Sequence, residues 1–124
     1  MINPSLLTGG DLAFIGDAYL ELYVRNHIIN LGITSLKKLH NESVKFVSRT
    51  SQHKLITTIL PTLSEEEVMI FKRGRNYHYK TRTEEYVNAS GLEALLGYLY
   101  LTKNENRLEE LMKQMIEMVE KDNE

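Results

Sequence analysis

The stretch of sequence that decides the fold is LAFIGDAYLELYV, residues 12–24, in which only a glycine and two acidic residues are neither apolar nor aromatic. A helix that is apolar on almost every side is typical of a helix buried within a protein. We therefore predict a long buried helix from Asp11 to Leu31, with Gly32 as its C-terminal stop. Its acidic residues need an explanation, because buried carboxylates are costly unless they are paired, hydrogen-bonded or bound to a cation.

Outside this stretch the apolar residues keep a helical period almost throughout, and no segment needs to be a strand. A capping box begins one later helix, since Ser64 is followed three residues on by Glu67, and basic residues with Gly74 end that helix. The expected order is a short turn over Leu36–His40, a helix from Asn41 that ends before Pro61, the helix opened by Ser64, a loop over residues 76–86, and helices over Ala89–Leu101 and Glu105–Lys121. The predicted fold class is all-α, a bundle of five helices around one core, in a single domain over residues 1–124.

Composition excludes several classes of protein. The 124 residues contain no cysteine, which excludes disulfides, thiolate zinc sites and cysteine nucleophiles and suits a reducing compartment. No apolar run approaches the ~20 residues of a membrane span, and the N-terminus lacks the basic region of a secretory signal. We therefore expect a cytoplasmic protein with no membrane partner. The net charge of −2 does not by itself indicate a nucleic-acid partner.

The first helix carries a stripe of charge. Asp17, Glu21 and Arg25 follow one another at intervals of four residues and therefore share one face. One interpretation is a structural stripe of salt bridges, in which Arg25 neutralises Glu21. The alternative is that Asp17 faces a cleft and binds a hard cation through oxygen.

The predicted helix over residues 89–101 repeats the pattern, because Glu93 is its only charged residue. Small residues accompany both acids, with Gly16 beside Asp17 and Gly97 one turn after Glu93. Small residues allow two helix backbones to approach closely, so we predict that these helices bring Asp17 and Glu93 to one point. Two neighbouring carboxylates repel each other, and a divalent cation such as Mg²⁺ is the natural compensation.

Local charge departs from the global balance in residues 72–82, which hold five of the fifteen lysines and arginines and no acidic residue. Arginine and lysine beside hydroxyl and amide groups suit contacts with phosphate, and the interleaved tyrosines can stack on unpaired bases or simply anchor the loop. A solvated loop without a ligand is the alternative. The candidate residues for binding a polyanion such as RNA are Lys72, Arg73, Arg75, Asn76, Lys80 and Arg82.

Three motifs of this chain resemble the ribonuclease III family. LAFIGDAYLEL, residues 12–22, is similar to the signature helix of the family, and EALLGYLYL, residues 93–101, to its second acidic motif. KRGRN, residues 72–76, resembles the basic motif of the Mini-ribonuclease III branch, whose members lack a separate double-stranded-RNA-binding domain. The order and spacing of the three motifs, over nearly the whole chain, make the resemblance specific.

Carried over to this sequence, the resemblance makes Asp17 and Glu93 the catalytic and metal-binding carboxylates. Family members with the full set of carboxylates have glutamates at the positions of Gly10 and Ala13 and an aspartate at that of Ser90. This sequence therefore has fewer carboxylates at these positions, as does the Mini-ribonuclease III branch. The candidates for supporting the two ligands are Glu21, Ser90 and Asp11.

The resemblance implies an all-α endoribonuclease that acts as a homodimer. It implies cleavage of double-stranded RNA with Mg²⁺, for which Mn²⁺ can substitute, leaving 5′-phosphate and 3′-hydroxyl ends. For this branch it implies maturation of large-subunit ribosomal RNA precursors, with a ribosomal protein as a helper. Two alternatives stay open: a catalytically inactive domain that binds structured RNA, and a helical interaction module whose acids are only salt-bridged.

Overall fold

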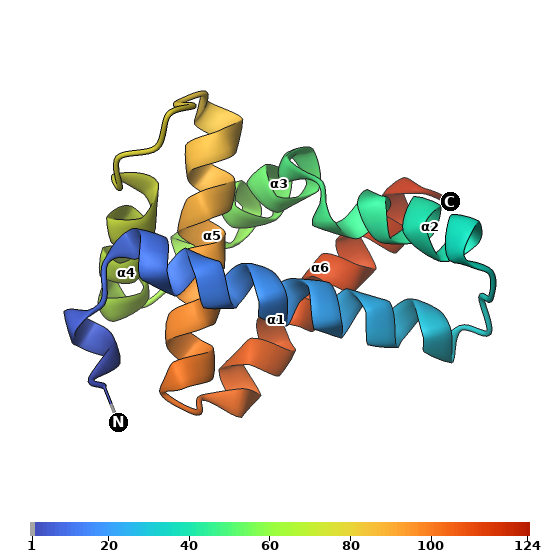
Figure 1. Ribbon diagram of the computed structural model, residues 1–124, viewed down its shortest axis with the longest axis horizontal. Coiled ribbons are helices and arrows are strands. Elements are labelled where there is room, and N and C mark those ends of the chain that lie inside the picture. Colours follow the sequence, from blue (N-terminus) through green and yellow to red (C-terminus); the bar gives the residue numbers. More distant parts are fainter. Residues whose placement is uncertain (1) are drawn as a thin grey trace.

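The structure, a computed structural model that describes residues 2–124, consists of helices joined by short turns and by one longer loop between α4 and α5 (Figure 1). No strand occurs in this part of the chain, which confirms the predicted all-α fold class. Two short 3-10 turns, η1 (Pro4–Leu6) and η2 (Leu60–Thr62), precede α1 and α4. The six α-helices are α1 (Gly9–Asn30), α2 (Leu36–Val47), α3 (Arg49–Ile59), α4 (Glu65–Arg75), α5 (Glu84–Leu101) and α6 (Glu105–Asp122).

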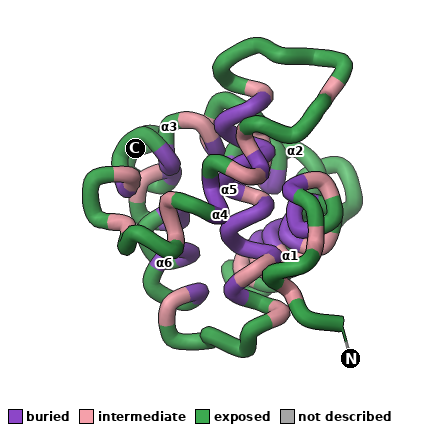
Figure 2. Tube along the Cα trace, turned by 90° about the vertical axis from the view of Figure 1, so that its left-hand side faces the viewer, coloured by how far each residue is buried: buried purple, intermediate pink, exposed green. Residues whose placement is uncertain are grey.

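Helix α5 is the centre of the fold. α1 crosses it, and α3 and α4 pack against it as well (Figure 1). Its residues are mostly buried, as the tube coloured by burial shows (Figure 2). The largest fully buried side chains of the core come from α1, α3, α5 and α6: Leu12, Leu20, Ile28, Leu55, Ile56, Ile59, Leu92, Leu95, Leu96, Leu111, Met112 and Met115.

Glycines set the distance between α1 and α5. A β-carbon added at Gly16 would overlap the carbonyl oxygen of Glu93, and one added at Gly97 would overlap that of Leu12. The two backbones therefore touch, which confirms the close approach predicted from the small residues. Because Asp17 follows Gly16 and Glu93 supplies one of the carbonyls, this contact holds the two acidic residues beside each other.

The helix predicted from Asn41 to Pro61 is divided in two. α2 already begins at Leu36, so the predicted short turn over Leu36–His40 is only its first part, and it ends at Val47. Ser48 is extended, with ψ of 153°, and its hydroxyl accepts a hydrogen bond from the backbone N–H of Ser51, which begins α3. The break turns the first residues of α3 toward α5.

Caps decide where the other helices begin and end. Thr83 caps α5, which therefore begins five residues before the predicted Ala89. The capping box at Ser64 is present as predicted, and Gly32, with φ of +87°, follows the end of α1 as expected. α4 ends at Arg75, within the basic run that was predicted to end it, but Gly74 does not break the helix. Gly74 lies inside the helix and is buried where α4 packs on α5, because a β-carbon there would overlap α5.

One face of α1 is open to solvent, contrary to the prediction of a helix buried on all sides. Phe14 is 83% exposed and Leu22 is 69% exposed, and Ala18 between them is exposed as well. The three residues are four apart, so they form one stripe along the helix. Nothing else within residues 2–124 covers this stripe, which we call the outer stripe of α1.

Candidate active site

A polar hollow of about 480 Å³ opens where α1, α3 and α5 meet the loop over residues 76–83. It therefore collects side chains from segments that are far apart in the sequence. The residues that line it are Gly10, Ala13, Phe14, Asp17, Val47, Ser48, Arg49, Gln52, Tyr79, Tyr86, Ser90 and Glu93.

The structure brings Asp17 and Glu93 together, as the sequence predicted. Both line the hollow, Asp17 as an exposed residue and Glu93 as a half-buried one. Burial of its carboxyl group, together with the adjacent Asp17 carboxylate, raises the pKa of Glu93 to about 8. The positive charge of Arg49 and the amide of Gln52 oppose this rise. A pair of carboxylates that resists carrying two negative charges is suited to a divalent cation.

Sequence reasoning missed Arg49 and Gln52, which the break before α3 directs to the hollow. The guanidinium carbon of Arg49 lies 3.9 Å from the centroid of the Tyr86 ring, a cation–π contact. Gln52 is buried one turn further along α3. The available signal was the pair Ser48 and Ser51, because serine is a frequent N-cap and marks the start of a new helix.

The donor atoms around the hollow fit a hard divalent cation. Two carboxylates line it, and two further side chains of its lining, Gln52 and Tyr79, have a buried oxygen without a hydrogen-bond partner in the described part of the chain. Mg²⁺ and Mn²⁺ prefer oxygen ligands of this kind. No cluster of three or more His, Cys, Asp or Glu occurs within residues 2–124. The two carboxylates would therefore hold the cation together with neutral oxygens and water.

Of the three candidates for supporting these ligands, only Ser90 lines the hollow, and it is buried. Glu21 instead accepts from Arg25 Nε at 3.3 Å, so this end of the charged stripe is a salt bridge. Asp11 belongs to the capping box of α1, where the N–H of Thr8 donates to its Oδ2 at 3.1 Å. Neither Glu21 nor Asp11 is part of the lining.

Two of the predicted polyanion-binding residues hold parts of the fold together. Arg73 donates to the carbonyl oxygens of Ser5 at 3.0 Å and Leu7 at 3.2 Å, which fastens the N-terminal segment to α4. Arg75 donates from Nε to Asn88 Oδ1 at 2.8 Å and so links α4 to α5. Both arginines are half-buried, and their guanidinium groups are occupied by protein acceptors.

The other predicted residues of this segment are exposed. They are Lys72, Asn76, Lys80 and Arg82, of which Asn76 follows the end of α4 and Arg82 donates to the carbonyl oxygen of Tyr77 at 2.9 Å. The rings of Tyr77, Tyr79 and Tyr86 stack edge to face, with centroids 5.1 and 5.4 Å apart. Tyr79 and Tyr86 also line the hollow, so the basic loop adjoins the two carboxylates.

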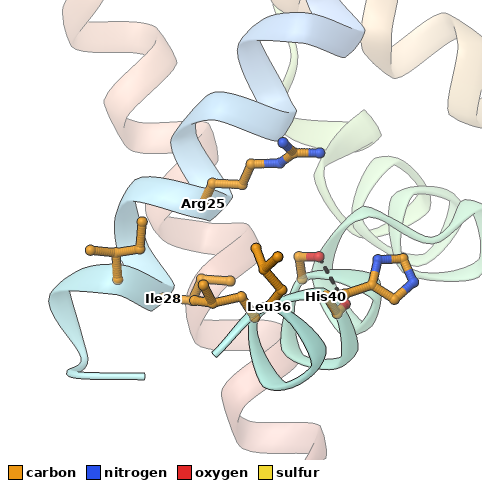
Figure 3. Close-up of a pocket in the computed structure, with 7 residues that line it drawn as sticks. Arg25, Ile28, Leu36 and His40 are labelled. Atoms are coloured by element: carbon orange, nitrogen blue, oxygen red, sulfur yellow. Dashed lines mark hydrogen bonds between the residues drawn. The ribbon is translucent and has the colours of Figure 1, made fainter. Parts of the chain in front are cut away.

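A second hollow of about 430 Å³ lies between the C-terminal half of α1 and α2. Its lining is mainly aliphatic, with Ile28 and Leu36 facing the space between the two helices and Arg25 and His40 at its edge (Figure 3). It contains no carboxylate, so it offers no site for a hard cation. The polar hollow, in which Asp17 and Glu93 meet, is the candidate active site.

Comparison with known proteins identifies the family. The ribonuclease III domain family matches residues 10–104. Mini-ribonuclease 3 of Streptococcus pneumoniae is 42% identical over 97% of this chain and 99% of its own length. The chain belongs to the Mini-ribonuclease III family. Mini-ribonuclease 3 of Staphylococcus aureus is 38% identical over 96% of this chain and 90% of its own length.

A solved structure has the same fold. The crystal structure of a protein from Fusobacterium nucleatum superimposes with a TM-score of 0.81, at 29% identity, over 90% of this chain and 93% of that one. As a member of the Mini-ribonuclease III family, the chain is an endoribonuclease of the ribonuclease III type. Its polar hollow lies within the matched residues.

Proposed function

We propose that this Mini-ribonuclease III cleaves double-stranded RNA in a reaction that depends on Mg²⁺, for which Mn²⁺ can substitute. The observation that carries the proposal is the meeting of Asp17 and Glu93, from two different helices, in one polar hollow. By the resemblance of their two motifs to the ribonuclease III family, both residues match its catalytic carboxylates. The two carboxylates are the residues that would hold the cation.

The residues around the pair have separate tasks in this proposal. A divalent cation bound here supplies Lewis-acid chemistry, which polarises the scissile phosphate and lowers the pKa of water. Arg49 is exposed beside Glu93, and its guanidinium group is placed to contact a non-bridging phosphate oxygen. The attack of water on the phosphodiester leaves 5′-phosphate and 3′-hydroxyl ends.

The exposed part of the basic segment binds the RNA backbone beside the hollow. An A-form duplex is recognised by its shape, phosphates and 2′-hydroxyl groups rather than by its bases. Lys72, Lys80 and Arg82 provide exposed positive charge for this contact, and Asn76 adds an amide. So small a basic surface predicts weak affinity for RNA, and a ribosomal protein that presents the substrate would compensate for it.

We also propose that the enzyme acts as a homodimer across the outer stripe of α1. Phe14, Ala18 and Leu22 expose an apolar strip that a second copy of the chain can cover. Phe14 also lines the hollow, so this contact would place two active sites next to each other. One site could then cut each strand of a duplex.

The biological substrate in this proposal is the precursor of large-subunit ribosomal RNA, processed in the cytoplasm. This part rests on membership of the Mini-ribonuclease III family. Separately, none of the helices in residues 2–124 has the length and hydropathy of a membrane span. Incubation of the chain with precursor RNA, followed by mapping of the new ends, tests this choice of substrate.

The decisive experiment for the activity uses the purified chain, a structured double-stranded RNA and Mg²⁺. Matched reactions contain Asp17→Asn or EDTA, and the product ends are identified by enzymatic labelling. We expect cleavage by the wild type alone, with 5′-phosphate ends. Binding without cleavage, also with Mn²⁺ and with precursor RNA, would instead favour an inactive RNA-binding domain. Products with 2′,3′-cyclic phosphates would contradict the proposed chemistry.

A further inference from the structure

Two buried side-chain polar atoms in the described residues have no hydrogen-bond partner, and both belong to the lining of one hollow. They are Oε1 of Gln52 and the hydroxyl oxygen of Tyr79. A buried polar atom without a partner is costly, and native proteins rarely keep one without a reason. Two of them next to Asp17 and Glu93 indicate a polar ligand that the chain itself does not supply.

The amide of Gln52 has a defined orientation. Its side chain is 3% exposed, and its Nε2 donates to the carbonyl oxygen of Val47 at 2.9 Å. Since that carbonyl oxygen can only accept, Nε2 must lie on the Val47 side. The other terminal atom is therefore the carbonyl oxygen Oε1, a pure acceptor that lacks a donor.

The hydroxyl of Tyr79 is held by packing of its ring. The ring lies between those of Tyr77 and Tyr86. Burial of the hydroxyl and the charge of Glu93 raise the pKa of Tyr79, while the nearby Ser90 hydroxyl lowers it. The Tyr79 hydroxyl nevertheless has no partner at full hydrogen-bonding geometry among the described residues. Like Oε1 of Gln52, it can accept a hydrogen bond.

We propose that Gln52 and Tyr79 are positioning residues for the hydration shell of the divalent cation. Mg²⁺ gives up its water reluctantly and is held by one or two carboxylates while it keeps several waters. Those waters donate hydrogen bonds, and the two unpartnered oxygens are acceptors. Gln52 and Tyr79 thus supply neutral oxygens in place of some of the carboxylates that this chain lacks. The inference rests on the proposed function, because it assumes the cation that Asp17 and Glu93 hold.

The test measures Mn²⁺ binding to the RNA-free chain of 124 residues by isothermal titration calorimetry at pH 8.5. The variants are Gln52→Met, which keeps the length of the side chain, and Tyr79→Phe, which removes a single oxygen. Residues of this outer layer typically change metal affinity tenfold or more, so we expect each variant to bind Mn²⁺ about tenfold more weakly. Asp17→Asn, which removes one of the two carboxylates that hold the cation, is the reference for lost Mn²⁺ binding.

The matched controls are Gln114→Met on α6 and Tyr100→Phe on α5, which lie outside the lining of the hollow. Both should bind Mn²⁺ like the wild type. Thermal unfolding with EDTA and with Mn²⁺ distinguishes a structural role from a role in metal binding. A loss of packing lowers the melting temperature under both conditions. Our inference instead predicts that Mn²⁺ raises the melting temperature of the variant less than that of the wild type. If Gln52→Met does not fold, the Mn²⁺ affinity of Tyr79→Phe alone tests the inference.

Two results would overturn the inference, and they differ in meaning. Mn²⁺ affinities within twofold of the wild type in both variants would remove Gln52 and Tyr79 from the site while the wild type still binds metal and cleaves RNA. A wild type that neither binds Mn²⁺ nor cleaves RNA would remove the proposed function together with the inference.

Discussion

Glu93 is subject to two opposing requirements. Burial and the nearby Asp17 carboxylate favour its protonated form and raise its pKa to about 8, whereas cation binding requires its charged form. In the metal-free protein at neutral pH, the pair therefore carries a single negative charge most of the time. Binding of a divalent cation should displace the second proton, so metal affinity should rise with pH and level off above about pH 8.

The same shift makes the stability of the metal-free protein depend on pH. The folded-state pKa of Glu93 lies above the usual value of 4.5, so the folded protein holds this proton more tightly than the unfolded chain. Its contribution to stability is full below about pH 4.5 and is lost as pH rises to about 8. Glu93→Gln, which cannot ionise, should melt about 5 °C above the wild type at pH 8.5 in EDTA.

The same comparison at pH 5 should show little difference between Glu93→Gln and the wild type. Added Mg²⁺ should raise the melting temperature of the wild type at pH 8.5 and leave that of the variant unchanged. Glu117→Gln, an exposed position on α6, is the control and should follow the wild type throughout. A parallel pH dependence in wild type and Glu93→Gln would contradict the burial argument.

The basic residues divide into two groups with different expected phenotypes. Arg73→Ala loses two hydrogen bonds to the carbonyl oxygens of Ser5 and Leu7, so unfolding in urea should show a loss of about 1–2 kcal/mol. Lys72→Ala and Lys80→Ala remove exposed charges and should leave stability unchanged. Each lysine variant should weaken duplex binding and lower the slope of log affinity against log salt by about 1. Full stability of Arg73→Ala, with RNA binding as weak as in the lysine variants, would reverse the assignment.

At the scale of helices, the site depends on one crossing. Gly16 and Gly97 let α1 and α5 touch through their backbones, and that contact sets the spacing between Asp17 and Glu93. A backbone oxygen cannot move aside as the end of a flexible side chain can. A change in the packing of α1 on α5 should therefore also change the position of Asp17 relative to Glu93.

Gly16→Ala should destabilise the protein by about 3 kcal/mol or prevent folding, because the new methyl group meets the carbonyl oxygen of Glu93. Gly10→Ala is the matched control on the same helix. The atoms nearest to its methyl group belong to the outer part of the Tyr77 ring rather than to backbone, and this side chain can rotate aside, so the change in the free energy of unfolding should be less than about 1 kcal/mol. Urea unfolding monitored by circular dichroism measures the free energy of unfolding of both variants. Equal losses in the two variants would show that α1 and α5 can move apart to accommodate a methyl group.

The helices also show which parts of the site could be predicted from the sequence. The pairing of Asp17 with Glu93 was predictable because small residues beside both acids allow the two helices to approach closely. Gln52 and Arg49 were not, because their direction depends on the extended conformation of Ser48, one residue within a continuous helical pattern. The tasks of Arg73 and Arg75 depend on acceptors in other segments, which no local pattern reveals.

At the scale of the whole molecule, the exposed outer stripe of α1 is the feature that one chain leaves unexplained. The sequence favoured a fully buried helix, and the single chain covers only its inner face. A second copy on the stripe would complete the burial that the sequence pattern indicated. Under the proposed assembly, the apolar pattern of α1 describes two chains rather than one.

Leu22→Asp should therefore convert the protein to a monomer in sedimentation velocity and abolish cleavage of both strands of a duplex. The charged side chain would have to be buried in the contact between copies. Met69→Asp is the control, since Met69 is similarly exposed at 66% but lies on α4, away from the stripe. A wild type that sediments as a monomer, or a dimeric Leu22→Asp, would contradict the proposed assembly.

The backbone contact between Gly16 and Glu93 has a consequence for control of the enzyme. Gly16 lies against the carbonyl oxygen of Glu93, so the spacing of Asp17 and Glu93 cannot change unless α1 unpacks from α5. We therefore expect regulation to act on what reaches the hollow, through the supply of cation and the exposure of the proposed RNA target.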